Sequence, residues 1–405
     1  MKYWTGYLTA GIIGAITWAL MRLAENFQEL VDMVYPYVTR TLLDVLAGWS
    51  SGVSFCLWQV GALVLGLGVI ASIVLMIVMK WNPVQWFGWV LTVAASIYFL
   101  NTLVFGLNYY AGPLSEDIRL EVREYSAQEL ADAAIYYRDK ANFLAKQVKR
   151  DANGDVIFDD FDTLAQKAGD GFDTLVYKFS YPVFAGSAVP VKELGWSDMY
   201  TSMGITGVTM GITGEAAVNP QIPAVSIPFT MCHEMAHRMS IANERDANFA
   251  GFLASMANED LQYQYSGYFM AYRYCYNALV GANTMEASSA AARVASEVNE
   301  ELQHDMDGYT RLFSSRSNKT ATKVANTAND TYLRASGDSA GVRSYGEVTD
   351  LLVSWHYQRV ILPSITTQEK KFDPYDENQV DLSGIVNAKE PKPTQPAPDV
   401  GGGVG

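Results

Sequence analysis

Residues 227–250 read IPFTMCHEMAHRMSIANERDANFA, and they contain the pattern from which the expected fold follows. On an α-helix His233 and His237 are four residues apart, so they project from one face and can bind the same metal ion. Glu234 lies beside them, where a carboxylate can take a proton from metal-bound water and pass it to a leaving amine. Two of the four histidines of the chain fall in this motif, which disfavours a chance match. We therefore expect a Zn²⁺ site with Glu234 as general base.

A zinc site of this kind needs a third protein ligand. The metzincin pattern would place Gly at Ser240 and His at Asn243, and both are absent. A second helix is expected from Asn243, and a carboxylate in its first turn can face the histidines. We favour Glu244, because Asp246 would follow the Asn243 cap at the third helical position, where an acid stabilises a helix start. Asp246 and Asn248 remain alternative ligands or groups that orient the histidines or the metal.

Three apolar stretches in the first part of the chain predict transmembrane helices at about 7–23, 54–79 and 84–107. The second and third stretches carry no charged residue except Lys80 between them, and each is long enough to cross about 30 Å of hydrocarbon. For the first stretch, a cleaved signal peptide is the alternative. Residues 25–49 are amphipathic, contain Pro36 and are expected outside the bilayer.

The positions of Lys2 and Lys80 orient the predicted spans. Because positively charged residues favour the cytoplasmic side, both are expected there. The chain is then a multi-pass protein of the cell membrane, and everything after about Leu107 is extracytoplasmic. Because the histidine motif lies far along the chain from the apolar spans, we expect its chemistry to take place outside the membrane.

Composition limits the partners. A net charge of −14 and a pI near 4.8 argue against nucleic acid, which requires clustered Lys and Arg. The three cysteines show no paired spacing, so neither a disulfide framework nor a cysteine zinc site is indicated. The expected partners are a peptide or protein substrate and the lipid bilayer. The oligomeric state is left open.

The predicted fold is a multi-span α-helical membrane anchor followed by a mainly α, α+β soluble domain of zincin type with a small β-sheet. The expected division is a membrane region at 1–112, a metallopeptidase domain at 113–386 and a disordered tail rich in Pro and Gly at 387–405. Residues 115–150 have helical periodicity, and the Gly- and Thr-rich residues 200–218 suggest short strands. Further helices are expected at 228–239, 243–257, 262–280, 286–302, 305–334 and 346–362.

The sequence resembles the gluzincin-like peptidases, in which HExxH is followed by a helix reading E-x-E/D-A-N/D. More closely, it resembles a bacterial family described only as domain-of-unknown-function family 3810. The segments that carry this resemblance are Gly214–Asn219, Pro228–Glu234, Glu244–Phe249 and Gly341–Gly346. Ser240 stands where similar sequences tend to have Gly, and Asp246 stands where they tend to have Glu.

The gluzincin resemblance implies further roles. A strand upstream of the motif helix would bind an extended peptide by main-chain pairing, and Gly214, Glu215 and Ala216 are the candidates. For Glu215, a solvated strand position is the alternative. Tyr345, in a Ser-Tyr-Gly turn, is a candidate donor to the developing oxyanion, with an ordinary packed tyrosine as the alternative. His304 and His356 are fallback donors.

These features predict a membrane-anchored, zinc-dependent metallopeptidase that hydrolyses peptide bonds. The alternative is a catalytically silent membrane protein of the same fold that acts as a sensor or an assembly partner. Glu234 favours the enzyme, because a closed structural zinc site has no need of an acid there. A transporter is disfavoured, since the two clear spans lack charged residues that would form a pathway.

Overall fold

Helices dominate the computed structural model, which describes residues 3–186, 189–338 and 347–363. The chain forms two compact units, Met1–Val360 and Ile361–Gly405. All elements that bear on the site belong to the first unit. The expected tail at 387–405 lies outside the described residues.

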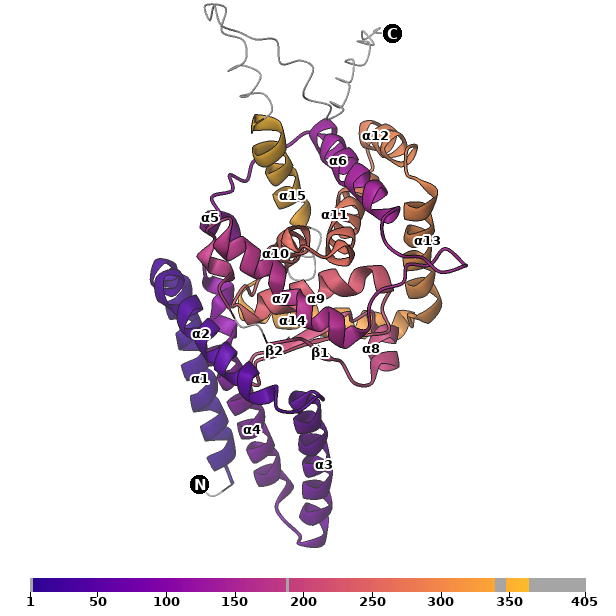
Figure 1. Cartoon of the computed structure of the whole chain (residues 1–405). Helices are drawn as coiled ribbons and strands as arrows, with labels where there is room; N and C mark the ends of the chain where they lie inside the picture. Colours follow the sequence, from indigo (N-terminus) through magenta and orange to yellow (C-terminus); the bar gives the residue numbers. More distant parts are fainter. Residues whose placement is uncertain (1–2, 187–188, 339–346, 364–405) are drawn as a thin grey trace, which may run out of the picture. The chain divides into compact units, whose positions relative to one another are not determined.

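Figure 1 shows the elements in chain order, coloured along the sequence. The helices are α1 (Thr5–Asn26), α2 (Gln28–Ser50), α3 (Leu57–Val78), α4 (Pro83–Val104), η1 (Gly106–Tyr110), α5 (Leu114–Asp117), α6 (Ala127–Ala145), α7 (Phe161–Tyr177), η2 (Pro182–Phe184), α8 (Ser197–Met203), η3 (Ala224–Ser226), α9 (Ile227–Arg238), α10 (Glu244–Ala257), α11 (Leu261–Gly281), α12 (Met285–Ala295), α13 (Glu300–Arg316), α14 (Lys319–Ser336), α15 (Val348–His356) and the π-helical η5 (Tyr357–Ile361).

Three short strands form the small sheet that the sequence suggested: β1 (Lys192–Glu193), β2 (Gly207–Met210) and β3 (Glu215–Val218). The strand order is β1-β3-β2, with β1 parallel and β2 antiparallel to β3. The register pairs Gly207 with Val218 and Met210 with Glu215, which leaves β3 in the middle and β2 at an edge. Residues 200–203, which were also expected in this strand region, belong instead to α8.

Helices α1, α3 and α4 are long and apolar enough to cross a membrane, as expected from the sequence. Their bounds lie within a few residues of the predicted spans. The start of α4 is fixed locally, because the Asn82 side chain accepts hydrogen bonds from the backbone N–H groups of Val84 and Gln85, and Pro83 occupies the first turn. The Thr92 hydroxyl of α4 donates to the Gly6 carbonyl of α1 over 2.8 Å, which ties these two helices together.

The amphipathic segment between the first two predicted spans is one helix, α2, which runs through Pro36. One of its faces, with Thr39, Leu43, Ala47 and Ser50, is buried. Large apolar side chains with helical spacing are exposed on the remaining surface: Leu30, Met33, Val34, Tyr37, Val38, Leu42, Val45 and Trp49. The segment expected to be amphipathic is thus a single helix with one buried face and an exposed apolar surface.

The sheet holds the first turn of α3. The Glu215 carboxylate accepts hydrogen bonds from the backbone N–H groups of Leu57 (2.8 Å) and Trp58 (3.0 Å). The same carboxylate pairs with Lys192 of β1 over 2.7 Å, and its side chain is 0% exposed. The Gln59 amide exchanges two hydrogen bonds with the backbone of Gly195. The first N–H groups of a helix lack partners within it. The Glu215 carboxylate therefore supplies hydrogen-bond acceptors and a negative charge at the start of α3.

Replacement of Glu215 by Gln is expected to lower the stability of the protein by about 3–5 kcal/mol, because it removes one partner of a buried ion pair and leaves the Lys192 charge uncompensated. Thermal unfolding of the full chain in detergent, followed by tryptophan fluorescence, measures the effect. Glu193→Gln is the matched control, since Glu193 is next to Lys192 on β1 and is exposed. Equal melting temperatures for the two variants would contradict the capping role.

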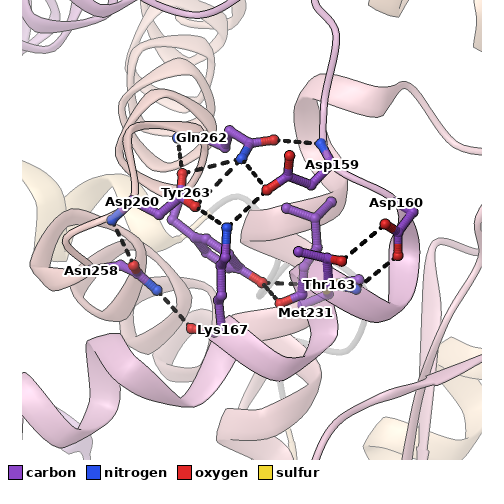
Figure 2. A network of polar contacts seen from close by, with 10 residues as sticks. Asp159, Asp160, Thr163, Lys167, Met231, Asn258, Asp260, Gln262 and Tyr263 are labelled. Carbon is purple, nitrogen blue, oxygen red and sulfur yellow. Dashed lines mark hydrogen bonds and ion pairs between the residues drawn. The ribbon is translucent and has the colours of Figure 1, made fainter.

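The motif helix α9 lies in the centre of the fold and packs against α7, α10, α11 and the strands β2 and β3. Figure 2 shows the polar network that fixes two of these neighbours. Lys167 of α7 forms ion pairs of 2.8 Å with Asp159 and with Asp260 at the start of α11. Tyr263 donates to the Leu164 carbonyl over 2.6 Å and lies 3.4 Å from the sulfur of Met231 on α9. The network therefore joins α7 to the start of α11 and contacts α9 at Met231.

Two of the predicted helices are wrong in extent. The helix expected at 286–302 ends at Ala295, and the one expected at 305–334 is two helices, α13 and α14. Asn299 and Asn318 explain both breaks, because each caps a new helix by accepting a hydrogen bond from the backbone N–H of Leu302 and Thr320, respectively.

Candidate metal centre and its cavity

Helix α9 carries the histidine motif and is buried along almost its whole length. Pro228 occupies the first turn, where its missing N–H group is tolerated. His233, Glu234 and His237 are 8%, 4% and 7% exposed. Such burial of three ionisable side chains is unfavourable unless they have partners, so their neighbours decide what the group can do.

The third member of the group is Glu244, the first residue of α10. Its Oε2 lies 3.4 Å from the Nε2 of His233 and 3.4 Å from the Nε2 of His237. The two Nε2 atoms are 3.2 Å apart. These are the atoms through which all three side chains can hold one metal ion. The structure thus brings His233, His237 and Glu244 together, as the sequence predicted.

The Nδ1 of His237 lies 2.8 Å from the carbonyl oxygen of Ile241, so an N–H at Nδ1 donates to it. In the neutral imidazole that binds a metal, the lone pair of Nε2 then faces the group. The Nδ1 of His233 has no hydrogen-bond partner among the described residues. Burial lowers the pKa of His237, but Glu244 outweighs burial and raises this pKa to about 9. Burial raises the pKa of Glu244, but the two histidines hold it well below its usual range. Glu244 is therefore ionised, and its negative charge attracts a cation.

Asp246 and Asn248 have other partners. The Asp246 carboxylate accepts a hydrogen bond of 2.9 Å from the backbone N–H of Leu114 and pairs with Arg245 over 3.0 Å. It thus holds the start of α5 rather than the histidines. Asn248 accepts a hydrogen bond of 3.1 Å from the Tyr274 hydroxyl. Of the two acids between which the sequence left a choice, Glu244 is the one placed to bind a metal.

Glu234 is held by the edge strand β2. The Thr209 hydroxyl lies 2.7 Å from Oε2 of Glu234 and 2.9 Å from its backbone carbonyl, and it can donate to either. A side chain at Gly207 would collide with Glu234, because a Cβ built there lies 2.3 Å from Oε1. Burial raises the pKa of the Glu234 carboxyl above its ordinary value. A raised pKa makes this carboxylate a better proton acceptor.

The side chains of His233, Glu234, His237 and Glu244 line part of a cavity of about 950 Å³. The other walls could not be predicted from the sequence, because they come from elements far apart along the chain. They belong to α4 and η1, to β2 with its flanks, and to α14: Ala94, Ile97, Tyr98, Asn101, Phe105, Tyr109, Gly204, Ile205, Thr206, Gly207, Val208, Thr209, Met210, Ile212, Ala325, Asn326, Asn329, Tyr332 and Leu333.

A family profile described as "Protein of unknown function (DUF3810)" matches residues 31–353. The chain belongs to the DUF3810 family. No curated protein and no solved structure matches the chain. The match confirms the resemblance to the DUF3810 family. All residues of the candidate metal centre and of its cavity lie inside the DUF3810 segment, whereas α1 precedes it.

Ser240, where the DUF3810 resemblance leads us to expect Gly, ends the motif helix in a left-handed conformation with φ of 70°. Glycine adopts this conformation at no steric cost, and it is common just after a helix. The Ser240 hydroxyl lies 2.8 Å from that of Thr39 on α2. The hydroxyl thus gives this chain a contact to α2 that glycine cannot make.

The residues predicted to form the substrate strand of this DUF3810 protein are buried in the structure. Glu215 and Ala216 belong to β3 and are 2% and 1% exposed, so neither offers its backbone to an added strand. Glu215 is not solvated, because its carboxylate is buried and caps α3. Gly214 has φ of 66° and packs on the α2 backbone, where a Cβ would lie 2.5 Å from the carbonyl oxygen of Leu43. The strand that borders the cavity is β2.

Of the other predicted donors, His304 and His356 do not line the described cavity of the DUF3810 protein. Tyr345 lies outside the described residues. His304 pairs with Asp155 over 2.7 Å, and His356 packs 5.1 Å from the ring of Tyr136. The tyrosines that line the cavity are Tyr98, Tyr109 and Tyr332. No local sequence motif surrounds these tyrosines, so only the tertiary structure shows that they line the cavity.

Replacement of Gly207 by Ala in the DUF3810 protein is expected to displace Glu234 while the metal ligands stay in place. If Glu234 acts as general base, peptide cleavage should fall by about 10²-fold or more, with little change in zinc content. Cleavage rates and metal analysis of the same preparation measure both. Gly281→Ala is a control on α11, where a Cβ meets no atom within 4 Å. Unchanged cleavage by Gly207→Ala would contradict the assigned position of Glu234.

Proposed function

We propose that this protein is a membrane-anchored, zinc-dependent metallopeptidase of gluzincin type that hydrolyses peptide bonds. The observation that carries this proposal is the convergence of three ligand atoms from His233, His237 and Glu244 next to the buried carboxylate of Glu234. Three protein ligands that face a large cavity leave a position for water and substrate. This distinguishes catalytic from structural zinc sites.

The three distances fit zinc. Ligands about 2.1 Å from a zinc ion at the corners of a tetrahedron lie about 3.4 Å from one another. The observed separations are 3.2, 3.4 and 3.4 Å. Two imidazoles and one carboxylate are also a ligand set of known zinc peptidases. Cys56, Cys232 and Cys275 are buried and do not line the cavity, so they do not compete as ligands.

Zinc bound by His233, His237 and Glu244 would supply Lewis-acid chemistry, which acidifies water and polarises the carbonyl group to be attacked. Glu234 would accept the proton of the attacking water and deliver it to the departing amine. Thr209 fixes one of its carboxylate oxygens, and the close approach of Gly207 limits its movement. A side chain held in one position reacts without the entropy loss of ordering.

Edge strand β2 is suited to hold the substrate. It pairs with β3 along one side, and no described strand pairs with its other side. Residues 204–210 line the cavity together with the metal-ligand side chains. An extended peptide can add to such an edge through main-chain hydrogen bonds, which suits a protease because these bonds do not depend on sequence. This replaces the role first assigned to residues 214–216.

The helices α1, α3 and α4 support a multi-pass location in a cell membrane. Lys80 lies in the turn between α3 and α4, at the opposite end of these helices from the candidate site. Because positively charged turns favour the cytoplasm, the candidate site would face the extracytoplasmic side.

The test is metal content and cleavage of casein or mixed-sequence peptides by the full chain in detergent. The full chain is required because α4 lines the cavity and Glu215 caps α3, so residues 113–386 alone would lack part of the site. About one zinc per chain and cleavage abolished by a chelator and restored by zinc are expected. Bound zinc without cleavage of any substrate would favour the silent sensor or assembly protein.

A further inference from the structure

One wall of the cavity is a face of helix α4. The lining residues Ala94, Ile97, Tyr98 and Asn101 have the spacing i, i+3, i+4 and i+7, which places them on one side of a helix. Phe105 continues the wall just beyond the helix. Asn101 is fixed by a hydrogen bond of 3.1 Å to the Tyr332 hydroxyl of α14. The cavity therefore extends along α4 from the metal ligands.

This wall reaches into the part of α4 that is apolar enough to lie in a membrane. Ala94 precedes the end of α4 at Val104 by ten residues, which corresponds to about 15 Å along a helix. That length is about half of the 30 Å thickness of the hydrocarbon layer. When α4 spans the bilayer, the far end of the cavity lies at the depth of lipid rather than of bulk water.

Helix α2 places the metal centre at the surface of the membrane. It joins the end of α1 to the start of α3, so two membrane-crossing helices oblige α2 to lie along one membrane face. Its exposed apolar side chains suit the headgroup region, and Trp49, 80% exposed, is a residue enriched there. On its other face Arg40 donates to the Met239 carbonyl over 3.1 Å, next to the end of α9. The metal ligands are thus anchored to an interfacial helix.

The chemistry of the cavity indicates what it accepts. Apart from His233, Glu234, His237 and Glu244, its lining residues among the described part of the chain are aliphatic, aromatic, thioether, hydroxyl or amide side chains and glycine. Ile97 is 39% exposed and so offers apolar surface to an occupant. Such a lining favours a neutral, apolar segment over a charged one, because unpaired charge is costly to desolvate.

From these observations we propose that the substrate is a membrane-anchored polypeptide that is cut where it leaves the bilayer. The apolar end of the cleaved segment lies against α4, and its extended part pairs with the free edge of β2. Water adds across the peptide bond: the carbonyl carbon gains oxygen, the C–N bond breaks, and Glu234 passes a proton to the new amine. The inference rests on the proposed peptidase function and adds the substrate class. Cleavage still takes place outside the hydrocarbon, but at its surface.

The test uses the full chain with zinc in vesicles of phosphatidylethanolamine and phosphatidylglycerol. Quenched-fluorescent peptides of mixed sequence are offered in three forms: free, attached directly to an apolar helix of about 20 residues in the same vesicles, and attached through a spacer of about 20 Gly and Ser residues. The two anchored forms have similar local concentrations. We expect cleavage of the directly attached form to be at least tenfold faster than that of the spaced form.

Equal cleavage of the two anchored forms would overturn the substrate class and leave the peptidase proposal intact. Zinc binding without cleavage of any of the three forms would overturn both. These two failures are therefore distinguishable in one experiment.

A pair of variants on α4 tests the wall itself. Ile97→Trp narrows the cavity, and Leu103→Trp changes an exposed residue that does not line it. Only Ile97→Trp should lower the ratio of direct to spaced cleavage. Binding is read without activity by placing the photo-reactive benzoylphenylalanine at either position in the Glu234→Gln background. Crosslinking of the directly attached peptide from position 97 and not from 103 is expected, and the reverse would contradict the proposal.

Discussion

A Glu234→Gln variant of the full chain is expected to retain its zinc and to lose peptide cleavage by about 10²–10⁴-fold, the usual contribution of a general base. The amide is nearly the same size as the carboxylate, so it fits over Gly207 and can still accept a hydrogen bond from Thr209. It cannot accept the proton of an attacking water at neutral pH. The loss should therefore fall on kcat rather than on KM.

The measurement combines cleavage rates with metal analysis, because each alone is ambiguous. Thr209→Val is a useful companion, since it removes the hydroxyl that positions Glu234 but keeps the carboxylate. Its activity should lie between those of the wild type and of Glu234→Gln. If Glu234→Gln cleaves peptides as fast as the wild type, Glu234 is not the base and the proposed mechanism fails.

A Glu244→Gln variant is expected to bind zinc at least about 100-fold more weakly than the wild type, and to lose activity in parallel. Loss of a group that only orients a ligand costs about 10–100-fold in metal affinity, so removal of an ionised ligand should cost more. Glu244 lies 3.4 Å from both imidazoles, and no amide carries the charge that zinc requires there.

Asp246→Asn is the matched control, because it changes the second acid of the same helix turn in the same way. Asparagine can still accept the hydrogen bond from Leu114, so folding should survive and zinc affinity should stay within about tenfold of the wild type. Zinc affinity is measured by competition with a chromogenic chelator. The opposite ranking of the two variants would make Asp246 the ligand and refute the assignment to Glu244.

The sequence predicted the helix with both histidines, the three apolar helices and the two acids that compete for the metal. It could not choose between Glu244 and Asp246 with certainty, because both lie in the first turn of α10 and the choice depends on how that helix rotates against α9. Tertiary packing sets this rotation. The N–H group of Leu114, which binds the Asp246 carboxylate, lies 132 residues from Asp246 along the chain.

Glu215 was misinterpreted for a similar reason. In sequence it is a single acid in a short strand, a position where exposure is the default. Its partners Leu57 and Lys192 lie 158 and 23 residues away along the chain, and no periodicity or spacing links them to it. The part of α4 that lines the cavity could not be predicted, because the apolar composition of α4 is fully accounted for by a membrane span. A second role leaves no additional mark on its composition.

The bond between Glu215 and the first turn of α3 also bears on how the protein is made. Leu57 and Glu215 are 158 residues apart, and a ribosome that adds about 5–20 residues per second needs about 8–30 s to cover that distance. During this interval the hairpin of α3 and α4 has left the ribosome, while its cap does not yet exist. Water must serve the first N–H groups of α3 until then. The hydrogen bonds between Glu215 and the first turn of α3 thus form late in biogenesis. A nascent chain arrested before residue 215 contains the α3–α4 hairpin without this cap.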